Sequence, residues 1–410
     1  MGDRHHVDPG ELTAVGAHRH TILSGISPGE PTSSSLLEAR GLVLAEDVTA
    51  PGDIPPFANS AMDGFAVVAD AVGEGSRLRV AGEIAAGAAD LPSPRGDEAI
   101  RIMTGAPIPA GATAVVPVEL VREQGGEIVL DIDPAEGENL REAGESVRAG
   151  EAILASGTLL GPSEIGLLAA MGIPRVHVHP KVRVATLATG DELVEPGKPL
   201  APGQIHESNS YGLAAQVAEA GAVAYRQPTA PDDRQALRRA FSSALSTADI
   251  LVTSGGVSAG TYDLSKQVMA EMGNVVFSKV AMQPGMPQAF GTIDGVVVFG
   301  LPGNPVSAAV SFEIFVRPAI RRMQGRADLN RPRLRATLGA DIRSPEHKVS
   351  FLRVTLARED DGWVARTTGA QGSGILKSMV LADGLAEVPV ERTSMSAGEQ
   401  VTVHLLSDPT

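Results

Sequence analysis

The chain has 410 residues, of which 43% are hydrophobic and 20% are charged. This composition is typical of globular proteins and excludes a disordered or membrane-embedded chain. The formal net charge of −15 and an aromatic content of only 3% argue against a broad nucleic-acid-binding surface and against base-stacking platforms. A chain of this length exceeds a single core, so roughly two to four domains are expected.

The chain contains no cysteine, so disulfides and thiolate chemistry are excluded. Residues 1–20 are polar and include His5, His6, His18 and His20. They contain no signal-peptide core and no myristoylation pattern, and no apolar run approaches the ~18 residues that span a bilayer. We therefore expect a cytoplasmic protein without membrane contact, and residues 1–20 are predicted to form a disordered polar tail rather than a metal site.

The first part of the chain predicts two helical pieces with a β-rich module inserted between them. Residues 33–46 predict a helix that the prolines at 51, 55 and 56 bring to an end. Residues 67–129 indicate short strands separated by glycine- and proline-containing turns. Residues 137–151 form a polar, glycine-punctuated exit from this module. A second helix is predicted over 162–171, because it begins on Pro162 and stops before Gly172.

From Lys181 onward, strands alternate with helices. Strands are predicted at 182–187, 223–227, 249–252, 275–280 and 296–299, and helices at 209–220, 233–245, from 263, and from 305 to about 322. This alternation predicts a parallel, doubly wound α/β sheet. After Arg326 the pattern becomes β again, with strands at 333–338, 349–357, 363–368 and 400–405, which predict a small all-β domain at the C-terminal end.

Ligands of an open parallel sheet bind beyond the carboxyl ends of its strands. Four loops in such positions carry polar or turn residues, namely 189–192, 229–233, 254–263 and 300–305. The loop that follows strand 249–252 contains Ser254, Gly255, Gly256 and Ser258. Glycines allow a ligand to approach the backbone, and the helix start that follows favours an anion. Taken alone, this pattern is as often an ordinary turn.

Acidic residues lie in the same loops. Asp232, Asp233 and Asp263 each precede a predicted helix, so each of them is explained first as a helix cap. Three carboxylates at one rim would repel one another unless they share a cation, and Mg²⁺ bound by one or two carboxylates and a ligand's phosphates resolves the repulsion. Such a site suits attack on a phosphoanhydride, with loop amides holding the phosphates.

Other sites are excluded by spacing. The serines and histidines form no nucleophile elbow or triad, and neither a Walker A motif nor a dinucleotide fingerprint is present. His177 and His179 alternate on a predicted strand and are interpreted as surface or core residues. Pro302 and Pro305 fix the backbone of their loop, and Pro305 is also a suitable first residue for the helix that follows.

Five motifs occur in the order found in the molybdopterin molybdenumtransferase (MoeA) family, which includes the E domain of gephyrin. They are Met62-Asp63-Gly64, Thr104-Gly105-Ala106, Thr189-Gly190-Asp191-Glu192-Leu193, Ser254-Gly255-Gly256-Val257-Ser258 and Gly300-Leu301-Pro302-Gly303-Asn304-Pro305. The resemblance covers nearly the whole chain after about residue 30, and it is specific as a set.

The resemblance implies a multidomain α/β homodimer with four subdomains in each chain. These are an elongated dimerisation part (12–52 and 149–180), the inserted β-rich part (53–148), a doubly wound molybdopterin-binding part (181–326) and a C-terminal β part (327–410). It further implies insertion of molybdate into adenylylated molybdopterin, with Mg²⁺, and release of AMP and molybdenum cofactor. Contacts with other proteins of cofactor biosynthesis are left open.

The family's functional residues are carried over by motif. Glu192, Asp232 and Asp263 are implied to serve the metal and pyrophosphate, and Ser254, Gly255, Gly256 and Ser258 the pterin phosphate or nucleotide. Lys279, Pro302 and Pro305 are implied to shape the molybdate and dithiolene pocket. Asp63 and Thr104 are implied to reach in from the partner subunit, and Arg353 and Ser373 to add an anion contact from the C-terminal part.

Two departures from the family pattern leave rival functions open. Met286 stands where many relatives have lysine, as does Gln283 in some of them, and Ser146 replaces an aspartate often found after Gly144-Glu145. The alternatives are an enzyme similar to molybdopterin adenylyltransferase, or a catalytically weak molybdopterin-binding scaffold. The β-rich insertion and the C-terminal β part argue against the first, because a stand-alone adenylyltransferase needs neither. The sequence leaves the choice between molybdate and tungstate undecided.

Overall fold

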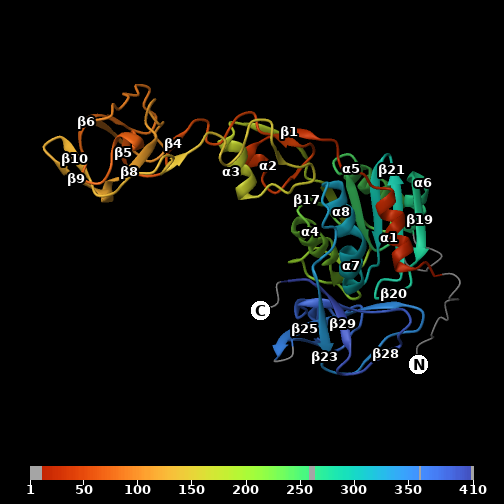
Figure 1. Cartoon of the computed structure of the whole chain (residues 1–410). Helices are drawn as coiled ribbons and strands as arrows, with labels where there is room; N and C mark the ends of the chain where they lie inside the picture. Colours follow the sequence, from red (N-terminus) through yellow and green to blue (C-terminus); the bar gives the residue numbers. More distant parts are fainter. Residues whose placement is uncertain (1–11, 258–263, 360–361, 408–410) are drawn as a thin grey trace. The chain divides into compact units, whose positions relative to one another are not determined.

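The computed structural model describes residues 12–257, 264–359 and 362–407. These residues form two compact units (Figure 1). The first unit contains the N-terminal residues up to 32, residues 41–45, and the chain from 178 onward, whereas the second contains residues 33–40 and 46–177. No helix in the described part of the chain is both long and apolar enough to cross a bilayer.

The first unit is built on a six-stranded sheet with the order β17-β14-β18-β22-β21-β19. The strands are β14 (Arg183–Ala188), β17 (Val223–Arg226), β18 (Ile250–Ser254), β19 (Asn274–Lys279), β21 (Pro287–Ile293) and β22 (Val296–Leu301). β14, β17, β18 and β22 pair in parallel, as the strand–helix alternation predicts.

The prediction of a wholly parallel sheet is wrong at β21, a strand that the sequence pattern did not indicate. β21 runs antiparallel to both β22 and β19. Asp294 and Gly295 connect β21 to β22, and both have positive φ, 49° and 81°. An Asp-Gly pair in this conformation is the preferred two-residue turn of an antiparallel hairpin. β19 therefore runs in the same direction as the four parallel strands.

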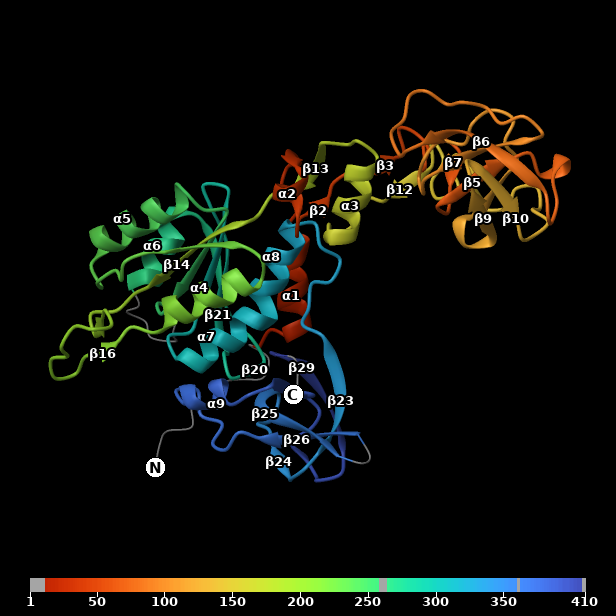
Figure 2. The same cartoon turned by 90° about the vertical axis from the view of Figure 1, so that its left-hand side faces the viewer.

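Helices cover both faces of this sheet, with α5 and α6 on one side and α4, α7 and α8 on the other (Figure 2). Their bounds are α4 (Asn209–Glu219), α5 (Arg234–Leu245), α6 (Leu264–Met272), α7 (Pro305–Ser311) and α8 (Arg317–Met323). A π-helical turn, η4 (Phe312–Val316), joins α7 to α8. The doubly wound arrangement predicted for residues 181–326 is thus present, apart from the antiparallel strand.

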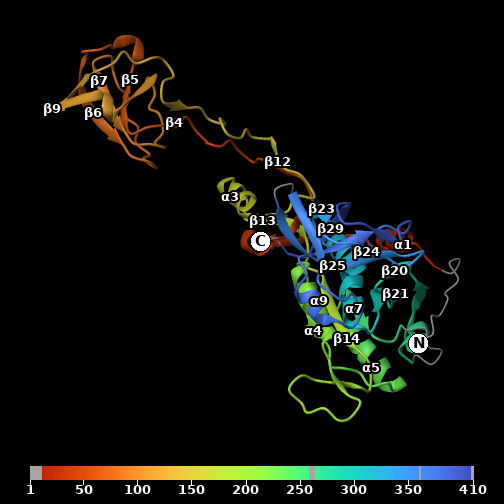
Figure 3. The same ribbon diagram turned by 90° about the horizontal axis from the view of Figure 1, so that it is seen from below.

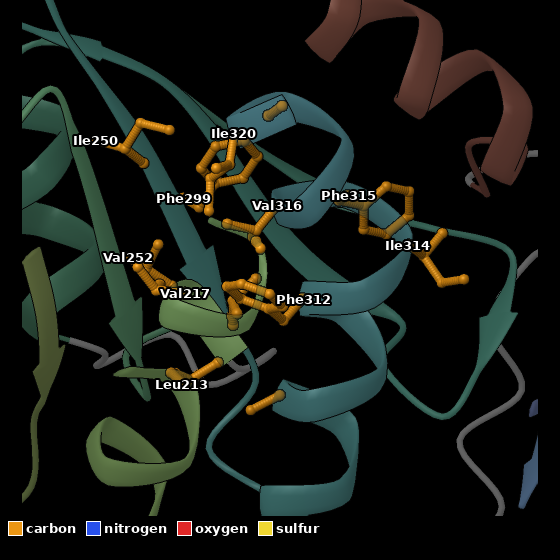
Figure 4. Close-up of a cluster of buried hydrophobic side chains, with 14 of the residues drawn as sticks. Leu213, Val217, Ile250, Val252, Phe299, Phe312, Ile314, Phe315, Val316 and Ile320 are labelled. Atoms are coloured by element: carbon orange, nitrogen blue, oxygen red, sulfur yellow. The ribbon is translucent and has the colours of Figure 1, made fainter. Parts of the chain in front are cut away.

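The larger core of this unit lies between the sheet and the α7–η4–α8 segment (Figure 4). Phe312, Val316 and Ile320 are fully buried and face Val252 and Phe299 of the sheet. All five residues of η4 are buried. Because burial of each large apolar side chain stabilises a fold by about 1.5–3 kcal/mol, this segment anchors the helical layer to the sheet.

A helix near the start of the chain contradicts the prediction of a disordered polar tail for the described part of residues 1–20, which begins at residue 12. α1 (Val15–Ser24) buries Ile22 and His18. The His18 ring packs edge-on against Phe315, with ring centroids 5.0 Å apart. The prediction was wrong because the buried residues of α1 are few and are widely spaced in an otherwise polar sequence. His5 and His6 lie outside the described residues.

The helix predicted over residues 33–46 is also largely wrong. Only α2 (Leu36–Ala39) is helical, flanked by the strands β1 (Thr32–Ser35) and β2 (Val43–Leu44). Glu38 accepts hydrogen bonds from the backbone N–H and the hydroxyl of Ser35, which begins the helix. Gly41 then takes a φ of 80°, a conformation that glycine adopts readily and that ends a helix.

The β-rich module lies in the second unit, as predicted. Its six-stranded sheet has the order β8-β5-β7-β6-β10-β9, formed by β5 (Gly64–Val67), β6 (Arg77–Ile84), β7 (Glu98–Ile102), β8 (Ala114–Pro117), β9 (Val121–Gln124) and β10 (Glu127–Leu130). Two apolar clusters, centred on Phe65 and on Ile100, pack within it. Short pairs, β3 (Val48–Thr49) with β12 (Ala152–Leu154) and β4 (Asn59–Ser60) with β11 (Leu140–Arg141), flank the module.

The rest of the second unit contains α3 (Pro162–Ala170), as the sequence predicts.

The C-terminal β part belongs to the first unit. Its strands are β23 (Arg333–Leu338), β25 (Val349–Glu359), β26 (Gly362–Thr367), β27 (Gly384–Val388) and β29 (Gln400–Leu405). β25 pairs with both β26 and β27, so these five strands close into a barrel. The short helix α9 (Leu376–Val380) lies between β26 and β27 in the chain, and Figure 3 shows the barrel strands from below.

Burial of His18 makes the stability of the first unit depend on pH. Burial lowers the pKa of His18 from 6.5 to about 4, so the unfolded chain binds more protons than the folded one between these values. Stability contributed by the neutral ring is therefore complete above pH 6.5 and falls as the pH drops towards 4. We expect this residue to account for a loss of about 2 kcal/mol between pH 7 and pH 5.

Urea unfolding of the wild type and of His18→Leu at pH 7 and pH 5 tests this expectation. The leucine cannot titrate, so the wild type should lose more stability than the variant on going to pH 5. An identical loss in the two proteins would contradict the assignment of His18 as a buried neutral ring.

Candidate functional site

The carboxyl ends of β14, β17, β18 and β22 bring four loops together at one rim of the sheet. Thr189, directly after β14, forms a parallel bridge with Ala230 of the loop after β17. Its backbone N–H donates to the carbonyl of Ser254 at the end of β18, with an N···O distance of 3.2 Å. The hydroxyl of Ser265, at the start of α6, lies 3.2 Å from that of Thr189. Loops that are up to 76 residues apart in the chain therefore meet around Thr189.

Gly255 lies where three of these loops come closest. Its φ is 90°, and a Cβ atom at this position would lie 2.9 Å from the Thr189 carbonyl oxygen. The Cα of Gly255 in turn lies 3.7 Å from the position that a Cβ would take at Gly303, and its N–H donates to the Leu301 carbonyl. Only glycine fits both the conformation and the space, as the glycine-rich pattern predicts.

Asn209 is a site residue that the sequence analysis did not identify. Its amide nitrogen donates to the Ser254 hydroxyl at 2.6 Å and to the Gly303 carbonyl at 2.7 Å. It is the first residue of α4 and therefore ties the start of that helix to the ends of β18 and β22. The sequence signal was present in Ser208-Asn209-Ser210, three cap-forming residues that open a helix, but capping alone did not distinguish this position from other helix starts.

A second network fixes the arm that leaves this rim between β15 (Leu193–Val194) and β16 (Ile205–His206). Glu195 accepts two hydrogen bonds from Arg226, at 3.0 and 3.1 Å, and one from the Tyr211 hydroxyl at 2.8 Å. The Arg226 guanidinium also stacks over the Tyr211 ring at 4.1 Å. Hydrogen bonds from Arg226 lower the pKa of Glu195. Buried Glu207 accepts from the N–H and the hydroxyl of Ser210, which fixes the first turn of α4.

The acidic residues of the rim have different local roles. Asp233 caps α5, with its carboxylate accepting from the N–H of Ala236 at 2.8 Å. The capping explanation is therefore correct for Asp233. The Asp191 carboxylate accepts from the N–H of Asp232 at 3.0 Å, which joins the loops after β14 and β17. Asp232 and Glu192 are both exposed, and the Glu192 carboxylate lies over Gly190, close to the position that a Cβ would occupy there.

The remaining predicted metal ligand, Asp263, and the predicted substrate contact Ser258 lie outside the described residues. Over the residues that the structure does describe, no group of three or more His, Asp or Glu side chains is placed to hold a metal. Of the predicted ligands, the described part thus offers Glu192 and Asp232, exposed on neighbouring loops. Mg²⁺ is commonly bound by one or two carboxylates together with phosphate oxygens and water. These two carboxylates therefore fit a Mg²⁺ ion whose coordination is completed by the phosphates of a bound ligand.

Pro302, Pro305 and Ser373 also lie at this rim. Pro302 directly follows β22, and its carbonyl lies 3.5 Å from the Ser254 hydroxyl. Pro305 is the first residue of α7, in agreement with the sequence prediction. The carbonyl of Ser373 accepts from the N–H of Val306 at 3.1 Å. The loop around Ser373, which belongs to the C-terminal β part, is therefore held against the start of α7.

Arg353 lies behind this loop and is fully buried. Its guanidinium donates to the Ser378 hydroxyl at 3.1 Å and to the Gly372 carbonyl at 3.2 Å, and burial lowers its pKa. These contacts fix the backbone that carries Ser373. Arg353 therefore holds this loop from inside the fold, whereas the family resemblance implies that it contacts an anion directly.

Lys279 ends β19, at the same rim but on an edge of the sheet. β18 and β19 are separated by β22 and β21, so three strand spacings, about 14 Å, lie between Ser254 and Lys279 along the sheet. Beyond Lys279 the chain turns back, and the N–H of Val280 donates to the carbonyl of Met286 at 2.7 Å.

Asp63 and Thr104 form a pair within the second unit. One carboxylate oxygen of Asp63 accepts from both the N–H and the hydroxyl of Thr104, each at 2.7 Å, and these bonds lower the pKa of Asp63. A Cβ at Gly64 would lie 2.1 Å from the Val116 carbonyl oxygen. The glycine of the Met62-Asp63-Gly64 motif is therefore required for β5 to pair with β8, and the motif presents an exposed, ionised Asp63.

Three family models match consecutive parts of the chain. They are described as the MoeA N-terminal region, domains I and II (residues 13–172), a probable molybdopterin binding domain (185–322), and the MoeA C-terminal region, domain IV (335–406). Together they span most of the chain, and the rim described above falls almost entirely within the second.

Curated proteins and solved structures agree with these matches. Molybdopterin molybdenumtransferase 2 of Mycobacterium tuberculosis is 40% identical over 403 residues, which cover 96% of this chain and 99% of that protein. Molybdopterin molybdenumtransferase of Haemophilus influenzae is 36% identical over 92% of this chain and 96% of its own. A crystal structure of the molybdopterin biosynthesis MoeA protein from Pyrococcus horikoshii matches with a TM-score of 0.83 and 33% identity, over 96% of this chain and 99% of that one.

The close contact at Gly255 predicts a difference between two glycines that have nearly the same backbone conformation. Gly197 has a φ of 88° and nothing within 4 Å of its added Cβ, whereas Gly255 combines a φ of 90° with the Thr189 carbonyl at 2.9 Å. Backbone strain alone costs about 1–3 kcal/mol at either position. Gly255→Ala should therefore lower the thermal unfolding midpoint more than Gly197→Ala does. Equal midpoints for the two variants would show that the loops at Gly255 are not in close contact.

Proposed function

We propose that this chain inserts molybdate into adenylylated molybdopterin and releases AMP. The proposal proceeds from its family, because the chain belongs to the molybdopterin molybdenumtransferase (MoeA) family and is a transferase of molybdenum cofactor biosynthesis. The observation that carries the proposal is the convergence of the loops after β14, β17, β18 and β22 at one rim. Backbone groups, hydroxyls and the exposed carboxylates of Glu192 and Asp232 lie on these loops.

The glycine loop is the part of the rim suited to phosphate. Gly255 and Gly256 both have positive φ. The Gly255 N–H is bonded to the Leu301 carbonyl, so the Gly256 amide, which has no side chain in front of it, is the one that we assign to the anion. An anion that approaches this backbone gains hydrogen bonds that are stronger than those between neutral groups. We assign the phosphates of the substrate to residues 254–256, with Ser258 completing the loop. Asn209 holds the Ser254 hydroxyl and the Gly303 carbonyl in fixed positions, so it acts as a positioning residue for the phosphate loop.

The carboxylates at the other end of the rim would hold Mg²⁺. Asp232 and Glu192 supply two hard oxygen donors from neighbouring loops, and Asp263 is assigned as the third. When bound, Mg²⁺ withdraws electron density from the phosphoanhydride and offsets the negative charge that develops at the leaving phosphate. Asp191 holds the backbone of Asp232, so the loop that carries the metal ligand is set before the substrate arrives.

Molybdate and the dithiolene are assigned to the Pro302–Pro305 side of the rim. Lys279, on the edge strand, and the Gly372–Ser373 backbone flank this side. Arg353 positions the Ser373 loop through its bonds to Gly372 and Ser378. Met286 contributes no positive charge where many relatives have lysine, so Lys279 is the cation that this assignment depends on.

Asp63 and Thr104 lie in the other unit, and we propose that they act on the rim of a partner subunit in a homodimer. The pair is exposed, and the hydrogen bonds from Thr104 favour the ionised form of the Asp63 carboxylate. An ionised carboxylate is suited to pair with a cation or a hydrogen-bond donor across an interface. The cytoplasmic location and the boundaries of the four subdomains stay predictions.

The experiment that tests this function is an assay with adenylylated molybdopterin, molybdate and Mg²⁺. We expect AMP to be released only when molybdate is present. Release of AMP without molybdate would contradict the coupled reaction. Synthesis of the adenylate from ATP and molybdopterin would instead support an adenylyltransferase. Tight binding of the substrate without turnover would support a scaffold. Tungstate in place of molybdate would establish the metal preference.

The same substitution is expected to have different effects at the two neighbouring aspartates of the loop after β17. Asp232→Asn removes a charge from the assigned metal site and should lower AMP release by about 10²-fold or more at low Mg²⁺, with partial recovery at high Mg²⁺. Asp233→Asn keeps the cap of α5, because asparagine caps helices as well as aspartate does, and should leave the rate unchanged. Equal rates for the two variants over a Mg²⁺ titration would remove Asp232 from the metal site.

A mixed dimer tests whether Asp63 acts in the partner subunit. A protein with Asp63→Ala in one subunit and Asp232→Ala in the other contains one site in which both residues are intact, provided that each site uses Asp63 from its partner. We expect each homodimeric variant to be nearly inactive and the mixed dimer to regain about half of the wild-type rate per dimer. An inactive mixed dimer, purified with two different tags, would place Asp63 and Asp232 in the same chain's site.

A further inference from the structure

A cavity of about 350 Å³ lies within the first unit, away from the rim. It is enclosed by the N-terminal half of α1, the π-helical turn η4 and the wall of the β-barrel. None of the residues to which the rim's function is assigned lines it. Its walls are largely apolar, formed by Val15, Ile314, Phe351, Leu385, Val390 and Leu406. A cavity of this size falls within the range that holds a small organic molecule.

Arginines are the main polar groups of this cavity. Arg331 is saturated, because its guanidinium bonds to Glu313, to Glu219 and to the Leu406 carbonyl. Arg19 is not. One of its terminal nitrogens donates to the neutral amide oxygen of Asn330, and its Nε is buried without a hydrogen-bond partner among the described residues. The Nε is out of reach of a ligand, but the guanidinium as a whole has only a neutral acceptor among the described residues, so a negatively charged acceptor in the cavity would pair with Arg19 more strongly than Asn330 does.

A second arginine, Arg333, lies close enough to repel Arg19. Burial and the charge of Arg333 both lower the pKa of Arg19, and the negative charge of Glu387 opposes this effect. The Glu387 carboxylate already accepts a hydrogen bond from His404 Nε2 at 2.7 Å, and this bond lowers its own pKa. Two arginines thus face one carboxylate that is engaged elsewhere, which leaves the polar end of the cavity with an excess of positive charge.

We propose that this cavity binds a carboxylate carried on an apolar body, as a second ligand site separate from the rim. A planar guanidinium pairs with a carboxylate through charge-assisted hydrogen bonds, and Arg19 brings such a group to the wall of the cavity. The apolar walls exclude a strongly hydrated inorganic anion and accept a ring or an aliphatic chain. The nearby Glu387 disfavours ligands with several negative charges, so a monocarboxylate is the class that fits.

Calorimetric titration of the full-length protein with 3-phenylpropanoate tests this proposal. The acid should bind saturably at one site, about tenfold or more tighter than 3-phenylpropanamide, which has the same body without the charge. Arg19→Leu should weaken the binding of the acid by about tenfold and leave that of the amide unchanged. Arg335→Leu is the control, because Arg335 lies on β23 as Arg333 does, bonds to Thr402 and does not line the cavity. This variant should bind the acid as the wild type does.

Gly16→Leu provides a second variant that leaves the arginines in place. Gly16 lines the cavity, and a Cβ added to it meets no atom within 4 Å, so a side chain can begin there without a clash, and leucine is expected to occupy part of the cavity. It should abolish binding of the acid. The proposal is overturned if the acid does not saturate at millimolar concentration, if inorganic phosphate or the amide binds as tightly as the acid, or if neither Arg19→Leu nor Gly16→Leu weakens binding.

Discussion

The contact of three backbone segments at Gly255 is the constraint on which the rim depends. The Thr189 carbonyl, the Gly255 backbone and Gly303 occupy a space in which no Cβ atom fits at Gly255. Because they follow three adjacent parallel strands, their spacing is set by the sheet itself, about 4.8 Å from strand to strand. A loop held in this way needs little reorganisation when a ligand binds beside it, which is the condition for strong electrostatic stabilisation.

This construction explains how a chain with a net charge of −15 can bind highly anionic substrates. Binding does not rely on a field of lysines and arginines. Neutral donors line one side of the rim, and the carboxylates Asp232 and Glu192 on the other side are suited to a divalent cation that the substrate shares. Two arginines near the rim, Arg226 and Arg353, are engaged by Glu195 and by Gly372 and Ser378 respectively, so they hold loops in place.

The sequence predicted the strands and helices of the doubly wound part because burial patterns repeat regularly there, and the four loops because glycine, proline and acidic residues follow each strand. It did not predict β21, although Asp294-Gly295 is a hairpin signal, because the alternating pattern favoured parallel strands. α1 and the interrupted segment at 33–46 were missed because tertiary contacts, such as that of His18 with Phe315, determine them. Asn209 was missed because its role depends on two strand ends that only the folded sheet brings to it.

The most direct test of the central claim is hydrogen–deuterium exchange of the full-length protein with and without adenylylated molybdopterin and Mg²⁺. The account predicts that exchange slows in residues 189–192, 230–233, 254–257 and 302–306 together, because one ligand spans all four loops. Slower exchange at only one of these loops, or protection confined to another part of the chain, would contradict a single binding site at the rim.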